Sequence, residues 1–363
     1  MTKEYDFPVA THSYFRALNI NEERALFLNS STYLPRFKYP KKLDVQVLEP
    51  RILETKTGSS ERQSLECAVI SAKLQTEDKW LSDFRNINQE MFGLPNKLYA
   101  IDILSRMSEP KNSAEQVYYK EIIDLLGDIK LSAEQLGPDK TIFDLYRGYF
   151  NNYRKQINRK ERDIIKAINN ELLASGLLDN GWTLQTKNDG SHARTYHHTK
   201  KIKIGENYNP RKILAVDRIV AHEIYGHALR GPRESLIESE GFALVIEQLT
   251  GSKFKFRRAY RYLAASLGWG IFGKPMNFRE VFEIIWRLMV ISSGYNEKQA
   301  KEHAFGECYR VFRGGRPDIA GAVYLKDIVY FDANIKVWDF LSANKLNYKE
   351  FVDIIEGRST ITL

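Results

Sequence analysis

Two histidines five residues apart, with a glutamate beside the first, constrain this chain more than any other feature. They lie in the segment HEIYGH, which begins at His222, and a second acidic segment, ESEGFA, begins at Glu238. Zinc takes imidazole nitrogens and carboxylate oxygens at about 2.0 to 2.2 Å, and a hydrolytic site uses three protein ligands so that the fourth position can hold water. His222, His227 and Glu240 can supply these ligands. Glu223 is then left to take a proton from the water.

The five-residue spacing of the histidines does not suit a regular α-helix. At about 100° per residue, four residues return to within about 40° of the starting face, but five overshoot to about 140°. One extra residue absorbed as a π-bulge takes back roughly one residue's rotation, and such bulges occur mostly at functional sites. We therefore predict a π-bulge that brings His227 to the side of His222, with Gly226 tolerating the distorted backbone. The alternative is an amphipathic helix with two incidental histidines.

Two glutamates of the second segment compete for the third ligand position. Glu240 shares one helical face with Glu247, two turns further on, whereas Glu238 points to nearly the opposite side. The other faces are apolar, which is typical of a buried helix, and carboxylates inside such a helix must be paired or bound to metal. Glu240 is the predicted ligand, and Glu247 is expected to pair with another group near the site.

These motifs resemble a known family. HEIYGH followed by SEGFA is similar to the paired motifs, HExxxH and EEGLA, of the uncharacterised-domain family that includes the microtubule-associated tyrosine carboxypeptidases. The segments EERALFLN, PRFKYP, CYRVFRGG and YLKDIVY also resemble that family, so the resemblance covers roughly residues 20–345. Ser239 stands where the family has the first Glu of its acidic pair, which favours Glu240 as the ligand. The insertion usual between the two motifs in the animal members is short here.

The resemblance implies a zinc-dependent carboxypeptidase with one zinc ion per chain. Such an enzyme removes a C-terminal residue, tyrosine or another aromatic residue, from a peptide or protein through zinc-activated water, with Glu223 as general base. The family's RVxRG and KDxxY motifs match at Arg313, Lys326 and Tyr330. Arg313 and Lys326 are therefore predicted to bind the terminal carboxylate, and Tyr330 to donate to the developing oxyanion. Alternatively, the basic side chains pair with acids such as Asp327 and only fix the loop.

Two other functions stay open. HExxGH with a following Glu is also the pattern of the dipeptidyl peptidase III family, whose chains are much longer, so an aminopeptidase or dipeptidyl peptidase is one alternative. The other is a regulatory protein that keeps a structural zinc and cleaves nothing. Glu223 argues against the second alternative, because a structural site has no use for a base beside the metal.

The amino-acid composition of the chain restricts the kinds of partner that it is expected to bind. The 363 residues are 28% charged and 43% hydrophobic, as in a soluble globular protein. There is no run of 18 apolar residues and no basic-then-apolar start, which predicts a cytoplasmic protein without a membrane partner. The net charge of +8 comes without a recognised nucleic-acid-binding motif, and it favours an acidic peptide or protein C-terminus instead. Cys67 and Cys308 are expected to be reduced core thiols.

The pattern along the chain predicts an α+β, mostly helical fold: a zincin-like metallopeptidase with a small β-sheet and a helical N-terminal lobe. Residues 1–58 are expected to form an extended arm with a short helix at 21–29, residues 59–178 the helical lobe, and residues 179–363 the catalytic region. Alternation after Trp182 predicts a β-hairpin.

The second half of this hairpin is expected to lie beside the metal helices. Lys201 to Gly205 is the predicted sheet edge, where an extended substrate could add a strand. His197 and His198 precede it, and since consecutive strand residues face opposite sides, at most one of them can face the site.

Overall fold

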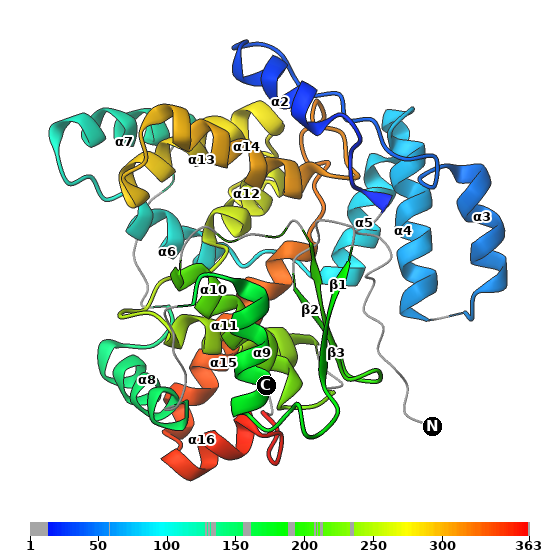
Figure 1. The fold of residues 1–363 in the computed structure, drawn as a ribbon. Coiled ribbons are helices and arrows are strands. Elements are labelled where there is room, and N and C mark those ends of the chain that lie inside the picture. Colours follow the sequence, from blue (N-terminus) through cyan, green and yellow to red (C-terminus); the bar gives the residue numbers. More distant parts are fainter. Residues whose placement is uncertain are drawn as a thin grey trace. The chain divides into compact units, whose positions relative to one another are not determined.

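In the part of the chain that it describes, the computed structural model consists mostly of helices, together with one three-stranded sheet (Figure 1), which agrees with the predicted mostly helical α+β class. No helix in the described part of the chain is long and apolar enough to cross a membrane. The residues that the structure describes are 14–57, 59–127, 129, 131, 136–154, 161–187, 193–206, 208, 210, 213–232 and 236–361.

The chain forms two compact units, each made from two separate segments. Unit A comprises Met1–Leu136 with Arg258–Val329, and unit B comprises Gly137–Arg257 with Tyr330–Leu363. The two units are therefore interleaved along the chain, whereas the regions 1–58, 59–178 and 179–363 expected from the sequence are continuous.

Unit A is helical. Its elements are α2 (Ile20–Leu28), α3 (Val45–Glu54), α4 (Ser60–Leu74), the 3-10 helix η1 (Asp78–Trp80), α5 (Leu81–Phe92), α6 (Lys97–Met107), α7 (Ser113–Leu126), α12 (Ala259–Trp269), α13 (Phe278–Ser293) and α14 (Glu297–Phe312). Asn277 and Glu280 form a capping box at the start of α13. Phe27 of α2 packs edge to face on Phe278 and Phe282, with ring centroids 5.1 and 4.7 Å apart. Cys67 and Cys308 are free and buried, as expected.

Unit B holds the sheet and the helices that carry His222, His227 and Glu240. Its elements are α8 (Lys140–Tyr153), α9 (Ile164–Ala174), β1 (Thr183–Lys187), β2 (Arg194–Tyr196), β3 (Lys201–Gly205), α10 (Ile213–Ala221), the π-helix η2 (His222–Ala228), α11 (Leu236–Leu249) and α16 (Tyr348–Ile355). Helix α15 (Lys326–Asn344) begins in unit A and continues into unit B.

The sheet corrects two expectations. Its strand order is β1-β3-β2, with β1 and β3 parallel and β2 and β3 antiparallel, so the first strand does not form a hairpin with the second. Residues 201–205 form the central strand rather than the edge. The reason is apolar content, because Ile202 and Ile204 are fully buried and favour the position with neighbours on both sides. β2 is an edge strand instead, and it packs against η2.

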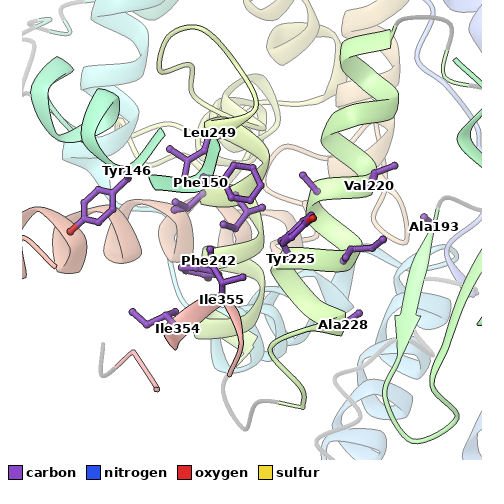
Figure 2. Packing of buried hydrophobic residues seen from close by; sticks show 14 of the residues in the cluster. Tyr146, Phe150, Ala193, Val220, Tyr225, Ala228, Phe242, Leu249, Ile354 and Ile355 are labelled. Atoms are coloured by element: carbon purple, nitrogen blue, oxygen red, sulfur yellow. The ribbon is translucent and has the colours of Figure 1, made fainter. Parts of the chain in front are cut away.

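The core of unit B surrounds α11. Phe150 of α8, Tyr225 of η2 and Phe242 of α11 belong to one buried cluster with residues of α16 (Figure 2). Helix α11 is buried on several faces, as its all-round apolar sequence predicted. A Cβ atom on Gly241 would lie 2.5 Å from the carbonyl oxygen of Ala333, so α11 and α15 make backbone-to-backbone contact there.

Candidate metal centre

Three side chains from two helices converge in unit B. His222 and His227 come from η2 and Glu240 comes from α11. The two Nε2 atoms lie 3.2 Å apart, and Glu240 Oε2 lies 3.7 Å from His222 Nε2 and 3.9 Å from His227 Nε2. The circle through three atoms at these separations has a radius of about 2.1 Å, which equals the usual distance from zinc to an imidazole nitrogen or a carboxylate oxygen. The three donors therefore fit a zinc ion at their common centre.

The predicted π-helical turn is confirmed. Residues His222–Ala228 form a π-helix, and the amide of Leu229 donates to the carbonyl of Ile224 at 2.9 Å, five residues earlier. This wider turn places the imidazole rings edge to face with centroids 4.9 Å apart. The local backbone geometry thus turns a spacing that fails on an α-helix into one that brings both Nε2 atoms together.

Gly226 serves a different purpose from the one expected. Its backbone angle φ is not positive, so any L-residue could adopt it. A Cβ atom at this position would, however, lie 2.5 Å from Ala243 Cβ and 2.6 Å from Ala243 Cα. Glycine is required because η2 and α11 touch there, and this close approach sets the distance between the helices that carry the three ligands.

The other ring nitrogen of each imidazole faces a polar side chain, within hydrogen-bond distance for His227 but not for His222. His227 Nδ1 lies 3.2 Å from Ser239 Oγ, and His222 Nδ1 lies 3.6 Å from Glu247 Oε2, just beyond hydrogen-bond distance. Partners at Nδ1 fix the ring orientation and leave Nε2 as the metal-binding nitrogen. Glu247 is held in turn by an ion pair with Arg257. The pairing expected for Glu247 is therefore present.

Glu223 lies buried beside the cluster and is held from the sheet. Its Oε2 accepts a hydrogen bond of 2.8 Å from Thr195 Oγ1 on the edge strand β2. Burial raises the pKa of Glu223, although His222 and Thr195 oppose this shift. A carboxylate with a raised pKa is well matched to accepting and returning a proton.

The electrostatics of the site favour a bound cation. Burial, followed by the charges of His222 and His197, holds the pKa of His227 well below its usual range, so this ring is neutral and can bind metal. Burial also lowers the pKa of His222, but Glu247, Glu223 and Glu240 outweigh it and the net shift is upward. These carboxylates favour positive charge at His222, and a divalent cation would supply it.

Glu238 lies outside the cluster of three donors. Its Oε1 pairs with Arg230 Nη2 at 2.6 Å and accepts a hydrogen bond of 3.2 Å from the amide of Ile361. Glu238 and Glu240 therefore point to different surroundings, as their helical positions predicted.

The predicted substrate-binding residues are divided between the units. Arg313 and Lys326 belong to unit A, whereas Tyr330 and the histidine cluster belong to unit B. Arg313 Nη2 lies 3.0 Å from Asp327 Oδ2, and its guanidinium group lies 5.3 Å from the centre of the Tyr324 ring. For Arg313 the geometry thus matches the alternative in which it fixes the loop. The substrate-binding roles of all three residues stay predictions.

Several residues near the site have partners that the sequence did not indicate. Thr195 donates a hydrogen bond to Glu223, and Ser239 Oγ lies within hydrogen-bond distance of His227. Burial raises the pKa of Tyr208, and the carboxylates of Glu247 and Glu223 add to the shift, which places this phenol near them. His197 is half-buried and packs edge to face on Trp182. For Thr195, His197 and Tyr208 the sequence signal was their position in or next to the predicted hairpin, whereas Ser239 lies in the SEGFA motif.

No protein-family model, no curated protein and no solved structure matches this chain.

Proposed function

We propose that this chain is a zinc-dependent peptidase that acts as a carboxypeptidase on a peptide or protein C-terminus. The observation that carries the proposal is the set of three donor atoms at separations of 3.2, 3.7 and 3.9 Å, with a buried glutamate directly after the first histidine. Three protein ligands leave a coordination position open, which is typical of catalytic rather than structural zinc.

Several residues around the three donor atoms have separate roles in the proposed reaction. Bound zinc would polarise a carbonyl group and lower the pKa of a water molecule. Glu223 accepts the proton of the attacking water and passes it to the amine nitrogen of the leaving residue. Thr195 holds the carboxylate of Glu223 in place through Oγ1, and Ser239 and Glu247 orient the two imidazoles.

The carboxypeptidase direction and the zincin-like fold rest on weaker support than the metal chemistry. They are supported by the resemblance of HEIYGH and SEGFA to the motifs of the tyrosine carboxypeptidase family. The helix-borne ligands and the edge strand β2 beside η2 are compatible with both. The same resemblance assigns recognition of the terminal carboxylate to Lys326, whereas Arg313 is already paired with Asp327.

The test compares a peptide that ends in a free carboxylate with its C-terminally amidated twin, followed by mass spectrometry. We expect the wild-type protein to shorten the free acid by one residue and to leave the amide largely intact. Glu223→Gln is the matched variant, because it keeps the size and hydrogen-bonding ability of the side chain but loses the base. Its turnover should fall by about 10² to 10⁴-fold with zinc content unchanged.

Each contrary result removes a different part of the proposal. Equal rates on both peptides would exclude the carboxypeptidase direction and keep the metallopeptidase. Wild-type turnover by Glu223→Gln would exclude the assigned mechanism.

A further inference from the structure

One arginine close to the candidate metal centre has a buried nitrogen atom without a partner. Arg218 lies in α10, four residues before His222, and its side chain is half-buried. Within the described part of the chain, Arg218 Nε is shielded from solvent and makes no hydrogen bond. A buried polar group that stays unpaired costs free energy, and a charged group costs more. Arg218 is therefore a place where a bound anion would be stabilised.

The acids that act on Arg218 are held by other arginines. Glu247 pairs with Arg257, and Asp217 Oδ1 lies 2.7 Å from Arg154 Nη1. Among the described residues, neither acid forms an ion pair with Arg218. Burial lowers the pKa of Arg218, and the charge of Arg257 lowers it further, whereas Glu247 and Asp217 raise it less. The positive charge of Arg218 is thus only partly compensated by its neighbours.

Helix geometry places Arg218 on the same side of the helix as His222. The step between them runs through α10, which ends at Ala221, and four residues return to within about 40° of the starting face. Side chains at this spacing are neighbours, with Cβ atoms about 5 to 6 Å apart. His222 Nε2 is one of the three donor atoms, so Arg218 starts one helical turn away from the predicted zinc ligand.

The end of α11 lies on the other side of the guanidinium group. Glu247 belongs to the last turn of α11, and its Oε2 lies 3.6 Å from His222 Nδ1. A Cβ atom on Gly251, two residues after this helix, would lie 4.0 Å from Arg218 Nη2. Tyr208 is close to Glu247 and to Glu223, because both carboxylates add to the effect of burial in raising the pKa of its phenol. Arg218 thus belongs to the surroundings of the proposed reacting groups.

A peptide substrate carries the kind of group that this arginine binds best. The planar guanidinium fork matches the two oxygen atoms of a carboxylate, and charge-assisted bonds of this kind are about twice as strong as neutral ones. Near its C-terminus a peptide offers two such groups, the terminal carboxylate and the side chain of an adjacent glutamate or aspartate.

We propose that Arg218 is a substrate-binding residue that pairs with a carboxylate group of the bound peptide. The group is the terminal carboxylate or an adjacent acidic side chain, since both present the same oxygen atoms. This assignment rests on the proposed peptidase function. It differs from the assignment of Lys326, which comes from the family resemblance, because Arg218 belongs to the same unit as the three donor residues.

The test measures peptide affinity by fluorescence anisotropy in the zinc-loaded Glu223→Gln protein, which is expected to bind peptide without cleaving it. The parent peptide is labelled at its N-terminus and ends in glutamate and tyrosine with a free carboxylate. One twin is amidated at the C-terminus, and the other has glutamine in place of the glutamate. We expect one twin to bind about tenfold or more weakly, because a charge-assisted pair is lost. The weaker twin identifies which carboxylate Arg218 binds.

Three arginine variants in the Glu223→Gln background assign this difference. Arg218→Gln should weaken the parent peptide by about tenfold or more and leave the weaker twin unchanged, so that the difference disappears. Arg218→Lys should keep part of it, because lysine retains the charge but not the fork. Arg147→Gln is the matched control and should keep all of it. Arg147 is also a half-buried arginine of unit B with a buried, unpaired Nε, but it lies in α8, which carries no donor residue.

Three outcomes would overturn the assignment. They are equal affinity for all three peptides before Arg218 is changed, a difference that survives Arg218→Gln, and equal weakening of all three peptides by Arg218→Gln. The last result, with a lower melting temperature, would mean that Arg218 only supports the fold at the end of α11.

Cleavage by the wild-type protein tests the proposed function separately. Cleavage together with unchanged binding in Arg218→Gln would exclude only the role of Arg218. Binding that depends on Arg218 without any cleavage would exclude the peptidase activity and keep the contact with the carboxylate.

Discussion

Replacing Gly226 by alanine tests whether the contact between η2 and α11 sets the metal site. The added Cβ would lie 2.5 and 2.6 Å from Ala243 Cβ and Cα, whereas ordinary carbon contacts are about 3.5 to 4.0 Å, so the helices must separate by roughly 1 Å. Overpacking of this kind costs about 1 to 3 kcal/mol. The better helix propensity of alanine returns about 0.5 to 1 kcal/mol, which leaves a net loss.

Two measurements follow the effect of Gly226→Ala. Thermal unfolding should show a melting temperature lower by about 2 to 8 °C. Zinc affinity, measured by competition with a chromophoric chelator, should fall by about tenfold or more, because Glu240 moves away from the histidines of η2. A change in stability alone would be an ordinary packing defect, whereas the two effects together indicate that the contact positions the ligands.

The control is Gly148→Ala in α8 of the same unit. A Cβ on Gly148 would meet nothing within 4 Å, so this change should leave stability unchanged or raise it by about 0.5 to 1 kcal/mol. Adding Ala243→Gly to Gly226→Ala removes the 2.5 Å contact and should restore part of both losses. The reasoning fails if Gly226→Ala matches Gly148→Ala in both melting temperature and zinc affinity.

Metal analysis of the purified protein should give about one zinc equivalent, which Glu240→Ala should lose and Glu238→Ala should keep; the reverse pattern would make Glu238 the ligand. Glu247→Ala should weaken zinc binding by about 10 to 100-fold while Glu247→Gln loses less, and equal affinity in all three proteins would exclude an orienting role. Lys326→Ala should erase much of the preference for free-acid over amidated peptide, as rate ratios would show. Burial alone would raise the pKa of Asp327, but four neighbouring arginines outweigh it and hold the pKa well below its usual range. The ionised Asp327 carboxylate therefore stabilises the fold fully above the unfolded-state pKa of about 3.9, and this stabilisation is lost as the pH falls below that value. Asp327→Asn should lower the free energy of unfolding by about 3 to 5 kcal/mol at pH 7 and by less in acid.

The sequence was most informative where local geometry decides the outcome. The rotation per residue was enough to predict the π-helical turn between His222 and His227, because it follows from helix geometry alone. The opposite surroundings of Glu238 and Glu240 follow from the same rule. These predictions needed no knowledge of what packs against the helix.

The strand order, helix α3 and the role of Gly226 depend on contacts between distant parts of the chain, and the sequence did not predict them correctly. The strand order could not be read from alternation, since the pattern of residues 183–205 does not say which strand has neighbours on both sides. Helix α3 was missed because Pro50 lies inside it, and its favourable packing on α4 is not visible in the sequence. The role of Gly226 depends on Ala243, and no local rule links these two positions.

The interleaving of the two units has a consequence for how the chain matures on the ribosome. Helix α11 carries Glu240, yet Gln248 near its end bonds to Trp338, which is 90 residues further along. At about 5 to 20 residues per second, roughly 5 to 20 seconds of synthesis separate the two partners. During that interval the nascent helix lacks the partner that will cover it, and such exposed apolar surface is what holding chaperones recognise. A chain whose synthesis ends between these codons would therefore contain His222, His227 and Glu240 without a finished unit to keep them in place.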